Sequence, residues 1–314
     1  MGLAQILNAI AGLLIVIGIG WLFSKKGWFP LQFRQYLPKI ITNLALPCML
    51  LTAFSGFDRQ DLPGLLKNAL LPYSGMLFCL LFAFAVAKII HVKRERFGLC
   101  CCCIANSNTM YIGLPFTMAL FGAESLPIFL TYYFANATFF WTVGNFLISG
   151  DVQTGENKFD LKSGIKRIFA PPIIALVIGI SCWGLDLHLP GFLQDALKCI
   201  GALTVPLALL FIGSQMAGID FRSIRAEKDL IFVLIGRLAI SPLVVWGLAP
   251  LFALSAYQQN IFLTQAALPV LMQAAILTAY YNGDSRFGSL AVSFSAIVSV
   301  VTIPICLLVL GKPM

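Results

Sequence analysis

A cluster of hydrogen-bonding side chains lies in the middle of an otherwise apolar stretch of the chain. From Phe97 to Ala123 the sequence runs 27 residues without a charge, which is enough to cross a membrane as a helix. Its middle reads Asn106-Ser107-Asn108-Thr109-Met110-Tyr111-Ile112-Gly113-Leu114-Pro115. Amide and hydroxyl groups are costly at this depth in lipid, and they are suited to holding a polar ligand by hydrogen bonds.

The same stretch contains residues that interrupt a helix. Gly113 relaxes the backbone, and Pro115 lacks an N–H donor and clashes with the preceding turn, so we expect the helix to break or kink there. Backbone groups freed by a break must face protein or a water-filled cavity. A broken helix near the middle of the bilayer therefore indicates a transporter binding site.

The composition predicts an all-α integral membrane protein. Charged residues make up 11% of the chain, against roughly 25% in soluble domains, and the mean hydropathy is +0.90. Ten stretches have the length and polarity of membrane spans: 3–23, 36–56, 68–88, 98–121, 126–149, 168–186, 195–217, 230–252, 258–281 and 288–310.

The basic residues are distributed unevenly between the connections. The net charge of +8 would suggest nucleic acid as a partner of a soluble protein, but sixteen of the 21 Lys and Arg residues lie in alternate connections. The positive-inside rule then places the odd-numbered connections in the cytoplasm and both termini outside, with the chain in the cytoplasmic (inner) membrane.

Ten spans divide into two sets of five, residues 1–150 and 168–314, joined by a short cytoplasmic linker at 151–167. An odd number of spans in each half forces the halves into opposite orientations, so we expect an inverted repeat. Pro47 is echoed by Pro206 and Pro115 by Pro269, at offsets of 159 and 154 residues that agree with this division.

The residues from Asn108 to Gly122 resemble a known motif. They are similar to the Asn-Thr-x-x-x-Gly-x-Pro-x-x-x-Ala-x-x-Gly stretch of the PIN-type auxin efflux carriers and their bacterial relatives. Ala266-Ala-Leu-Pro269 with Tyr281-Asn282 resembles the ninth helix of that family, and Arg237-Leu-Ala-Ile-Ser-Pro242 resembles its eighth. The short linker, in place of the large cytoplasmic loop of many plant members, favours the compact prokaryotic branch and argues against carrying auxin over as the substrate.

The resemblance implies a fold in which broken helices four and nine cross at their prolines. Spans one, two, six and seven would form a scaffold that makes a homodimer, and the other spans a moving transport bundle, as in an elevator mechanism. A helix that restarts after a break presents unpaired N–H groups and about half a positive charge, which favours an anion.

The candidate substrate-binding residues follow from this geometry, and each has a structural alternative. Asn108 and Asn106 would donate to a carboxylate, and Gln265 and Gln273 would form the opposite wall, but such side chains also bond neighbouring helices. The full set is Asn106, Asn108, Thr109, Tyr111, Gly113, Pro115, Asn136, Arg237, Gln265, Pro269 and Gln273. Arg237, a cation inside a span, either snorkels to the interface, attracts the anion or pairs with a carbonyl.

The acidic residues all lie at or near loops, so the midplane lacks carboxylates for a proton relay or a sodium site. Neither a cofactor nor a metal is expected, and the motifs of an enzyme are missing. The sequence therefore predicts a secondary carrier that exports small organic carboxylate anions across the bilayer by alternating access. An anion channel and a ligand-sensing membrane protein remain alternatives.

Overall fold

The computed structural model describes residues 3–53, 67–152, 171–187, 189–218 and 227–312, and the elements in these ranges are helices. In chain order they are α1 (Leu3–Lys25), α2 (Leu31–Ile40), α3 (Leu46–Thr52), α5 (Leu70–Ile89), α6 (Phe97–Ala105), α7 (Leu114–Phe121), α8 (Leu126–Phe139), α9 (Asn145–Gly150), α11 (Pro171–Gly184), α12 (Gly191–Gly201), α13 (Thr204–Ala217), α14 (Lys228–Ile235), α15 (Ser241–Leu248), α16 (Ala256–Ala266), α17 (Met272–Tyr280) and α18 (Ser285–Leu310). Single π-helical turns join α2 to α3, α8 to α9 and α14 to α15, and another, Thr109–Gly113, precedes α7.

Each of the ten predicted spans contains helix, but length alone identifies fewer membrane crossings. Within the described residues, four helical stretches are long and apolar enough to cross a membrane: Leu70–Ile89, Gly191–Ala217, Lys228–Leu251 and Ser285–Leu310. The ten-span inverted repeat and its two halves thus stay predictions. The predicted linker at 151–167 lies outside the described residues, apart from Asp151 and Val152.

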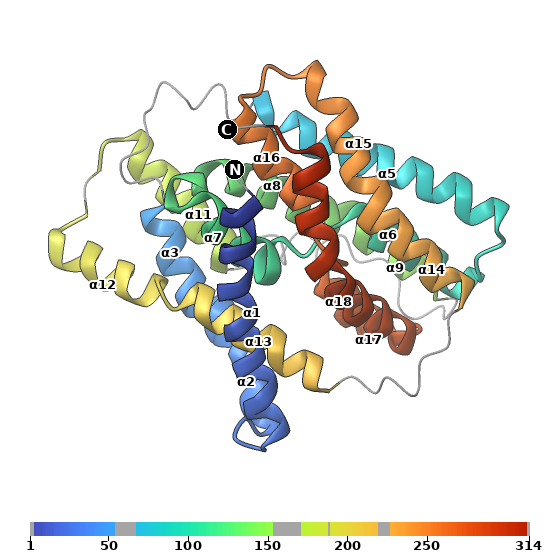
Figure 1. Ribbon diagram of the computed structural model, residues 1–314, viewed down its shortest axis with the longest axis horizontal. Coiled ribbons are helices and arrows are strands. Elements are labelled where there is room, and N and C mark those ends of the chain that lie inside the picture. Colours follow the sequence, from blue (N-terminus) through green and yellow to red (C-terminus); the bar gives the residue numbers. More distant parts are fainter. Residues whose placement is uncertain (1–2, 54–66, 153–170, 188, 219–226, 313–314) are drawn as a thin grey trace.

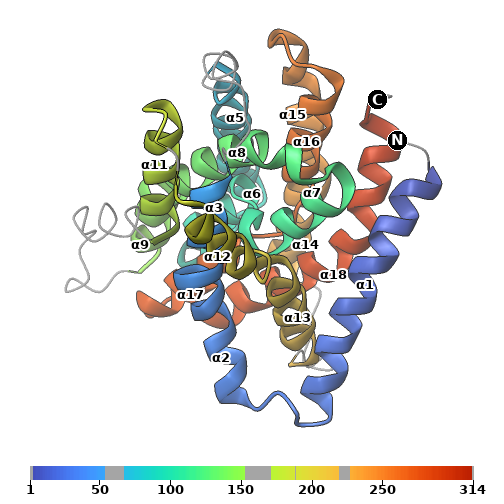
Figure 2. The same ribbon diagram turned by 90° about the vertical axis from the view of Figure 1, so that its left-hand side faces the viewer.

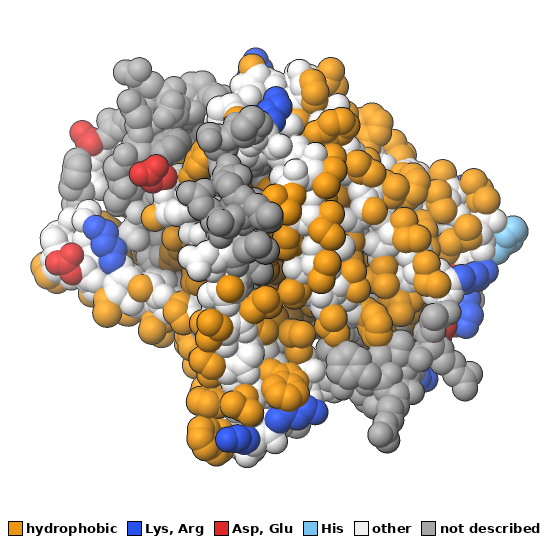
Figure 3. Space-filling model, viewed as in Figure 1, with side chains coloured by type: hydrophobic (Ala, Val, Ile, Leu, Met, Phe, Trp, Pro, Cys, Tyr) orange, Lys and Arg blue, Asp and Glu red, His pale blue; other side chains and the backbone are white. Residues whose placement is uncertain are grey.

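Large apolar side chains cover the outside of the helices, as Figure 3 shows for one face of the molecule. Exposed examples are Leu77, Phe78 and Leu81 on α5, Ile231 and Ile235 on α14, Leu243 and Trp246 on α15, and Val301 and Ile305 on α18. Contiguous apolar surface on this scale is rare on soluble monomers. These helices are therefore suited to contact lipid.

The helices pack in two groups that lie side by side (Figures 1 and 2). The first group contains α1, α2, α3, α11, α12 and α13, which correspond to predicted spans one, two, six and seven. The second group contains α5, α6, α8, α9 and α14 to α18, and α7 packs between the groups, against α1, α13 and α8. The first group thus contains the spans that the resemblance assigns to a scaffold, and a fixed scaffold with a moving bundle stays a prediction.

Close backbone contact between α1 and α13 holds the first group together. A side chain at Gly20 would collide with the backbone of Leu210, and one at Gly213 with the backbone of Ile17. Small residues at such contacts allow helices in lipid to gain van der Waals packing without a hydrophobic driving force.

An ionic cluster joins several helix ends of the second group. Arg96, just before α6, pairs with Glu227 and Asp284, and its Nε lies 2.6 Å from Asp284 Oδ2. Asp151, which follows α9, accepts the N–H groups of Gly98 and Leu99 at 2.7 and 2.8 Å and so caps the start of α6. Burial raises the pKa of Asp151 to about 6 even though these two donors favour the carboxylate.

Candidate functional site

The fourth predicted span is broken at its polar cluster. α6 ends at Ala105, Asn106 has extended backbone angles, and helix resumes at Thr109. The predicted position of the break, at Gly113 and Pro115, was therefore wrong. Pro115 lies just after the π-helical turn Thr109–Gly113, whose altered hydrogen-bond pattern accommodates a residue without an N–H donor, while the asparagine side chains of the cluster offer the backbone other hydrogen-bond partners.

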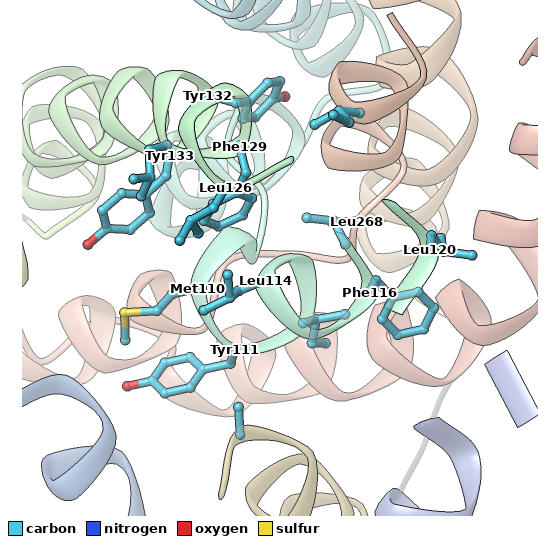
Figure 4. Close-up of a cluster of buried hydrophobic side chains, with 14 of the residues drawn as sticks. Met110, Tyr111, Leu114, Phe116, Leu120, Leu126, Phe129, Tyr132, Tyr133 and Leu268 are labelled. Atoms are coloured by element: carbon cyan, nitrogen blue, oxygen red, sulfur yellow. The ribbon is translucent and has the colours of Figure 1, made fainter. Parts of the chain in front are cut away.

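The ninth predicted span is broken as well, between α16 and α17, and Pro269 lies in that break. The two breaks meet. The N–H of Asn108 donates to the carbonyl of Pro269 at 2.9 Å, and Ser107 and Val270 form an antiparallel bridge. We call the paired segments 106–108 and 267–271 the crossover. Figure 4 shows Leu268 of the crossover among buried apolar side chains of α7 and α8.

Asn136 on α8 holds the first half of the crossover in its extended shape. Its side chain accepts the N–H of Ser107 at 3.1 Å and donates to the carbonyl of Ser107 at 2.9 Å. The Nδ2 of Asn106 donates to Asn136 Oδ1 at 3.1 Å, and Thr109 Oγ1 lies 3.4 Å from Asn136 Nδ2. All of these residues are buried, so Asn106 and Asn136 replace the helical hydrogen bonds lost at the break.

Arg237 is fully buried behind the crossover, so it does not snorkel to the membrane interface. Its guanidinium donates to carbonyls at the C-terminal end of α6 and just past the end of α16, at 2.8 Å to Ile104 and 3.1 Å to Leu268. It also bonds the carbonyl of Ala266 and, at 2.6 Å, the hydroxyl of Ser241. Of the three alternatives for Arg237, the structure shows pairing with carbonyls, where the helix ends carry partial negative charge.

A cavity of about 410 Å³ lies in front of the crossover, between the two helix groups. It is lined by side chains of α2, α13, α17 and α18 and of the turn that starts after the first break. Of the predicted site residues, Asn108 and Tyr111 line this cavity. The Tyr111 hydroxyl lies 3.2 Å from Thr42 Oγ1, and its ring packs against Phe211.

The predicted glutamines lie elsewhere around the crossover. Gln265 donates to Thr117 Oγ1 at 2.6 Å and so joins α16 to α7. Gly113 leaves room for it, because a Cβ there would collide with Gln265 and Leu268. The side-chain oxygens of Gln265 and Gln273 are buried without a hydrogen-bond donor among the described residues. Neither glutamine lines the cavity described above, and their contact with substrate stays a prediction.

Sequence reasoning missed the cavity residues on other helices, chiefly Arg34 on α2 and Gln215 on α13. The predicted second span starts at residue 36 and so leaves Arg34 in the basic connection before it. The structure starts α2 at Leu31, so Arg34 lies within the helix and on the same face as Pro38, four residues later. The four-residue spacing of Arg34 and Pro38 is the sequence feature that could have indicated that both face the cavity.

Comparison with known proteins supports the transporter interpretation of this arrangement. The sequence profile of a family described as membrane transport protein matches residues 5–307. The chain belongs to this family. The match confirms the resemblance to the auxin efflux carriers, whose family this is.

Two relatives of this membrane transport protein come from archaea. One, from Methanothermobacter thermautotrophicus, is 25% identical over 315 residues, covering 96% of this chain and 98% of the relative. The other, from Methanocaldococcus jannaschii, is 22% identical over 289 residues, covering 89% and 91%. Both are described as uncharacterized transporters, and both match this chain over nearly their whole length.

Proposed function

We propose that this membrane transport protein is a secondary carrier of small organic carboxylate anions, with the anion bound in the cavity at the crossover. The observation that carries the proposal is the meeting of two helix starts at one cavity. Asn108 precedes the restarted fourth span and Met272 is the first residue of α17, and both line the cavity.

The electrostatics of the cavity favour an anion. The helix dipole places about half a positive charge at each helix start. At the first start the N–H groups of Asn108, Thr109 and Tyr111 already donate to Pro269, Ser107 and the Asn108 side chain, so the dipole and the Asn108 amide supply the attraction. The lining includes the cation Arg34, and none of its residues is Asp or Glu. The helical segments that start after the two breaks thus turn their positive ends toward the cavity. Arg237 bonds the carbonyl ends of α6 and α16, which precede the breaks.

The remaining lining supports an organic substrate. Tyr111, Ile112, Phe211, Ile212 and Met272 present apolar surface next to the polar groups. A volume of about 410 Å³ falls in the range of small-molecule sites. A carboxylate with a small carbon skeleton satisfies both parts of the lining. Malonate, malate, lactate and indole-3-acetate all meet this description.

Alternating access would follow from the two helix groups. We assign the protein ten membrane spans in an inverted repeat of five plus five, in the cytoplasmic membrane as a homodimer, with both termini outside. α1 begins and α18 ends on the same side of the molecule, as an even number of spans requires (Figure 1). Movement of the second group past the first would carry the crossover and its anion across the bilayer, as in an elevator mechanism.

A ligand panel in detergent tests this proposal. Purified protein is heated with each of the four carboxylates and with their uncharged amides, such as lactamide and indole-3-acetamide. Binding to the folded state raises the unfolding temperature with ligand concentration. We expect at least one carboxylate to stabilise the protein and its amide to have no effect. Equal stabilisation by carboxylate and amide would contradict an anion site.

Transport separates a carrier from its alternatives. A channel would pass anions at rates that do not saturate, and a sensor would bind its ligand without moving it. Saturable uptake of the stabilising carboxylate into proteoliposomes is the result that the carrier predicts.

A further inference from the structure

Arg34 is a cation in the lining of the cavity that belongs to neither segment of the crossover. It lies on α2, is half-buried, and lines the cavity together with Gln35 and Pro38. Its Nε atom is buried and has no hydrogen-bond acceptor among the described residues. A guanidinium in such surroundings ordinarily pairs with a carboxylate or a carbonyl, because an unpaired buried donor loses its hydration without compensation.

Arg237 and Arg34 differ in their hydrogen-bond acceptors. The guanidinium of Arg237 donates to three carbonyls and one hydroxyl. Arg34 faces a cavity whose lining contains no acid. A planar guanidinium can hold a carboxylate through two parallel hydrogen bonds, which is a stronger and more selective contact than a single amide donor makes.

We propose that Arg34 is a specificity-determining residue that binds the substrate anion from the first helix group, opposite Asn108. This inference rests on the proposed function. Arg34 belongs to α2 and Asn108 to the crossover, so an anion that contacts both lies between the two helix groups. The contact exists only while the groups are arranged as they are here, because a movement of the crossover past α2 separates Asn108 from Arg34.

The helix ends near the cavity identify the side of the membrane on which this contact forms. The cavity is lined near the beginning of α2, the end of α13 and the beginning of α18. Arg286 lies at the beginning of α18, and Lys25 and Lys26 lie in the connection that leads into α2; the positive-inside rule places these basic residues in the cytoplasm. Arg34 therefore raises affinity for the anion in the state that faces the cytoplasm, and its loss from the site on closure favours release on the other side.

The test compares Arg34→Gln with a matched control on the same helix, Lys39→Gln. Lys39 also carries a positive charge on α2, but it lies over the ring of Tyr36 and does not line the cavity. Dissociation constants of malonate, malate, lactate and indole-3-acetate, and of their amides, are measured by calorimetry in detergent. We expect Arg34→Gln to weaken carboxylate binding about tenfold or more and to reduce the preference for carboxylate over amide, while Lys39→Gln changes binding less than about twofold.

Arg34→Lys serves as a second variant that keeps the charge and removes the planar fork, and we expect intermediate affinity from it. Carboxylate binding that is unchanged in Arg34→Gln and Arg34→Lys but lost in Asn108→Ala would overturn the role of Arg34 and leave the proposed function standing. Failure of all four carboxylates to bind the wild-type protein would overturn both.

Discussion

Asn108 is the residue at which the helix break, the crossover and the cavity meet. Its backbone N–H is bonded to Pro269, and its side-chain oxygen lies 3.4 Å from the N–H of Tyr111, at the start of the following turn. The described residues supply its Nδ2 group with no acceptor, and the side chain lines the cavity. Its amide hydrogens are therefore available to an anion.

Replacing Asn108 with Ala is expected to weaken carboxylate binding by about 1–3 kcal/mol, the usual value of a hydrogen bond to a charged group. Calorimetry on the purified variant measures this change. Asn145→Ala is the matched control, because Asn145 is equally buried but accepts the Tyr281 hydroxyl at 2.8 Å, away from the cavity. Unchanged affinity in Asn108→Ala, with the protein folded, would remove Asn108 from the site.

At this scale the sequence indicated the polar cluster but not what each of its side chains contacts. The run of polar residues from Asn106 to Asn108 inside an uncharged span was visible, because such residues are costly in lipid. The sequence did not show which of these side chains bond the protein and which faces the cavity. Asn106 and Asn136 bond each other and the backbone, while Asn108 faces the cavity, and this depends on the direction in which an extended segment leaves α6.

At the scale of helices, the crossover depends on what pairs with the helix ends on either side of the two breaks. α6 and α16 direct their carbonyl ends toward Arg237, and the following segments start at the cavity. The sequence predicted two breaks and placed Pro269 correctly. It placed the first break about two turns too late, because a π-helical turn just before Pro115 accommodates the proline within continuous helix.

Arg237→Met is expected to destabilise the protein strongly. The change leaves the carbonyls of Ile104, Ala266 and Leu268 buried without their donor, at roughly 1–3 kcal/mol for each group. Thermal unfolding in detergent measures the loss. Lys228→Met is the control, because the ammonium of Lys228 bonds the carbonyls of Ile90 and His91 at an exposed helix end. Equal stability of the two variants would refute the role given to Arg237.

Asp151 gives the start of α6 a dependence on pH. Its pKa is raised from 3.8 to about 6 by burial, so between these values the folded protein keeps a proton that the unfolded chain has lost. The stability that Asp151 contributes is thus greatest below pH 4 and falls as the pH rises to about 6, by at most about 3 kcal/mol. Unfolding of wild-type and Asp151→Asn protein at pH 4 and pH 7 measures the difference, and a difference that does not change with pH would contradict this expectation.

At the scale of the whole molecule, the two helix groups enclose the cavity at the crossover, whose lining contains no acid. The composition predicted a membrane protein, and the family match from residue 5 to 307 confirms that it is a transport protein. The side-by-side packing of α1 with α13 and of α3 with α11 joins residues more than a hundred positions apart, which periodicity in a single sequence does not reveal.

The central claim is that a carboxylate anion moves across the membrane through the crossover, and the acid-free lining of the cavity predicts that it does so without a coupling ion. The most direct measurement is accumulation of a radiolabelled carboxylate in sealed proteoliposomes under an imposed potassium diffusion potential. A monovalent anion moving alone gains about 2.3 kcal/mol per 100 mV, so the account predicts a gradient approaching fiftyfold at that potential. The gradient should persist when sodium is replaced by choline and should be abolished or greatly slowed by Asn108→Ala. Accumulation that collapses without sodium, or that follows a pH gradient at zero potential, would contradict the account.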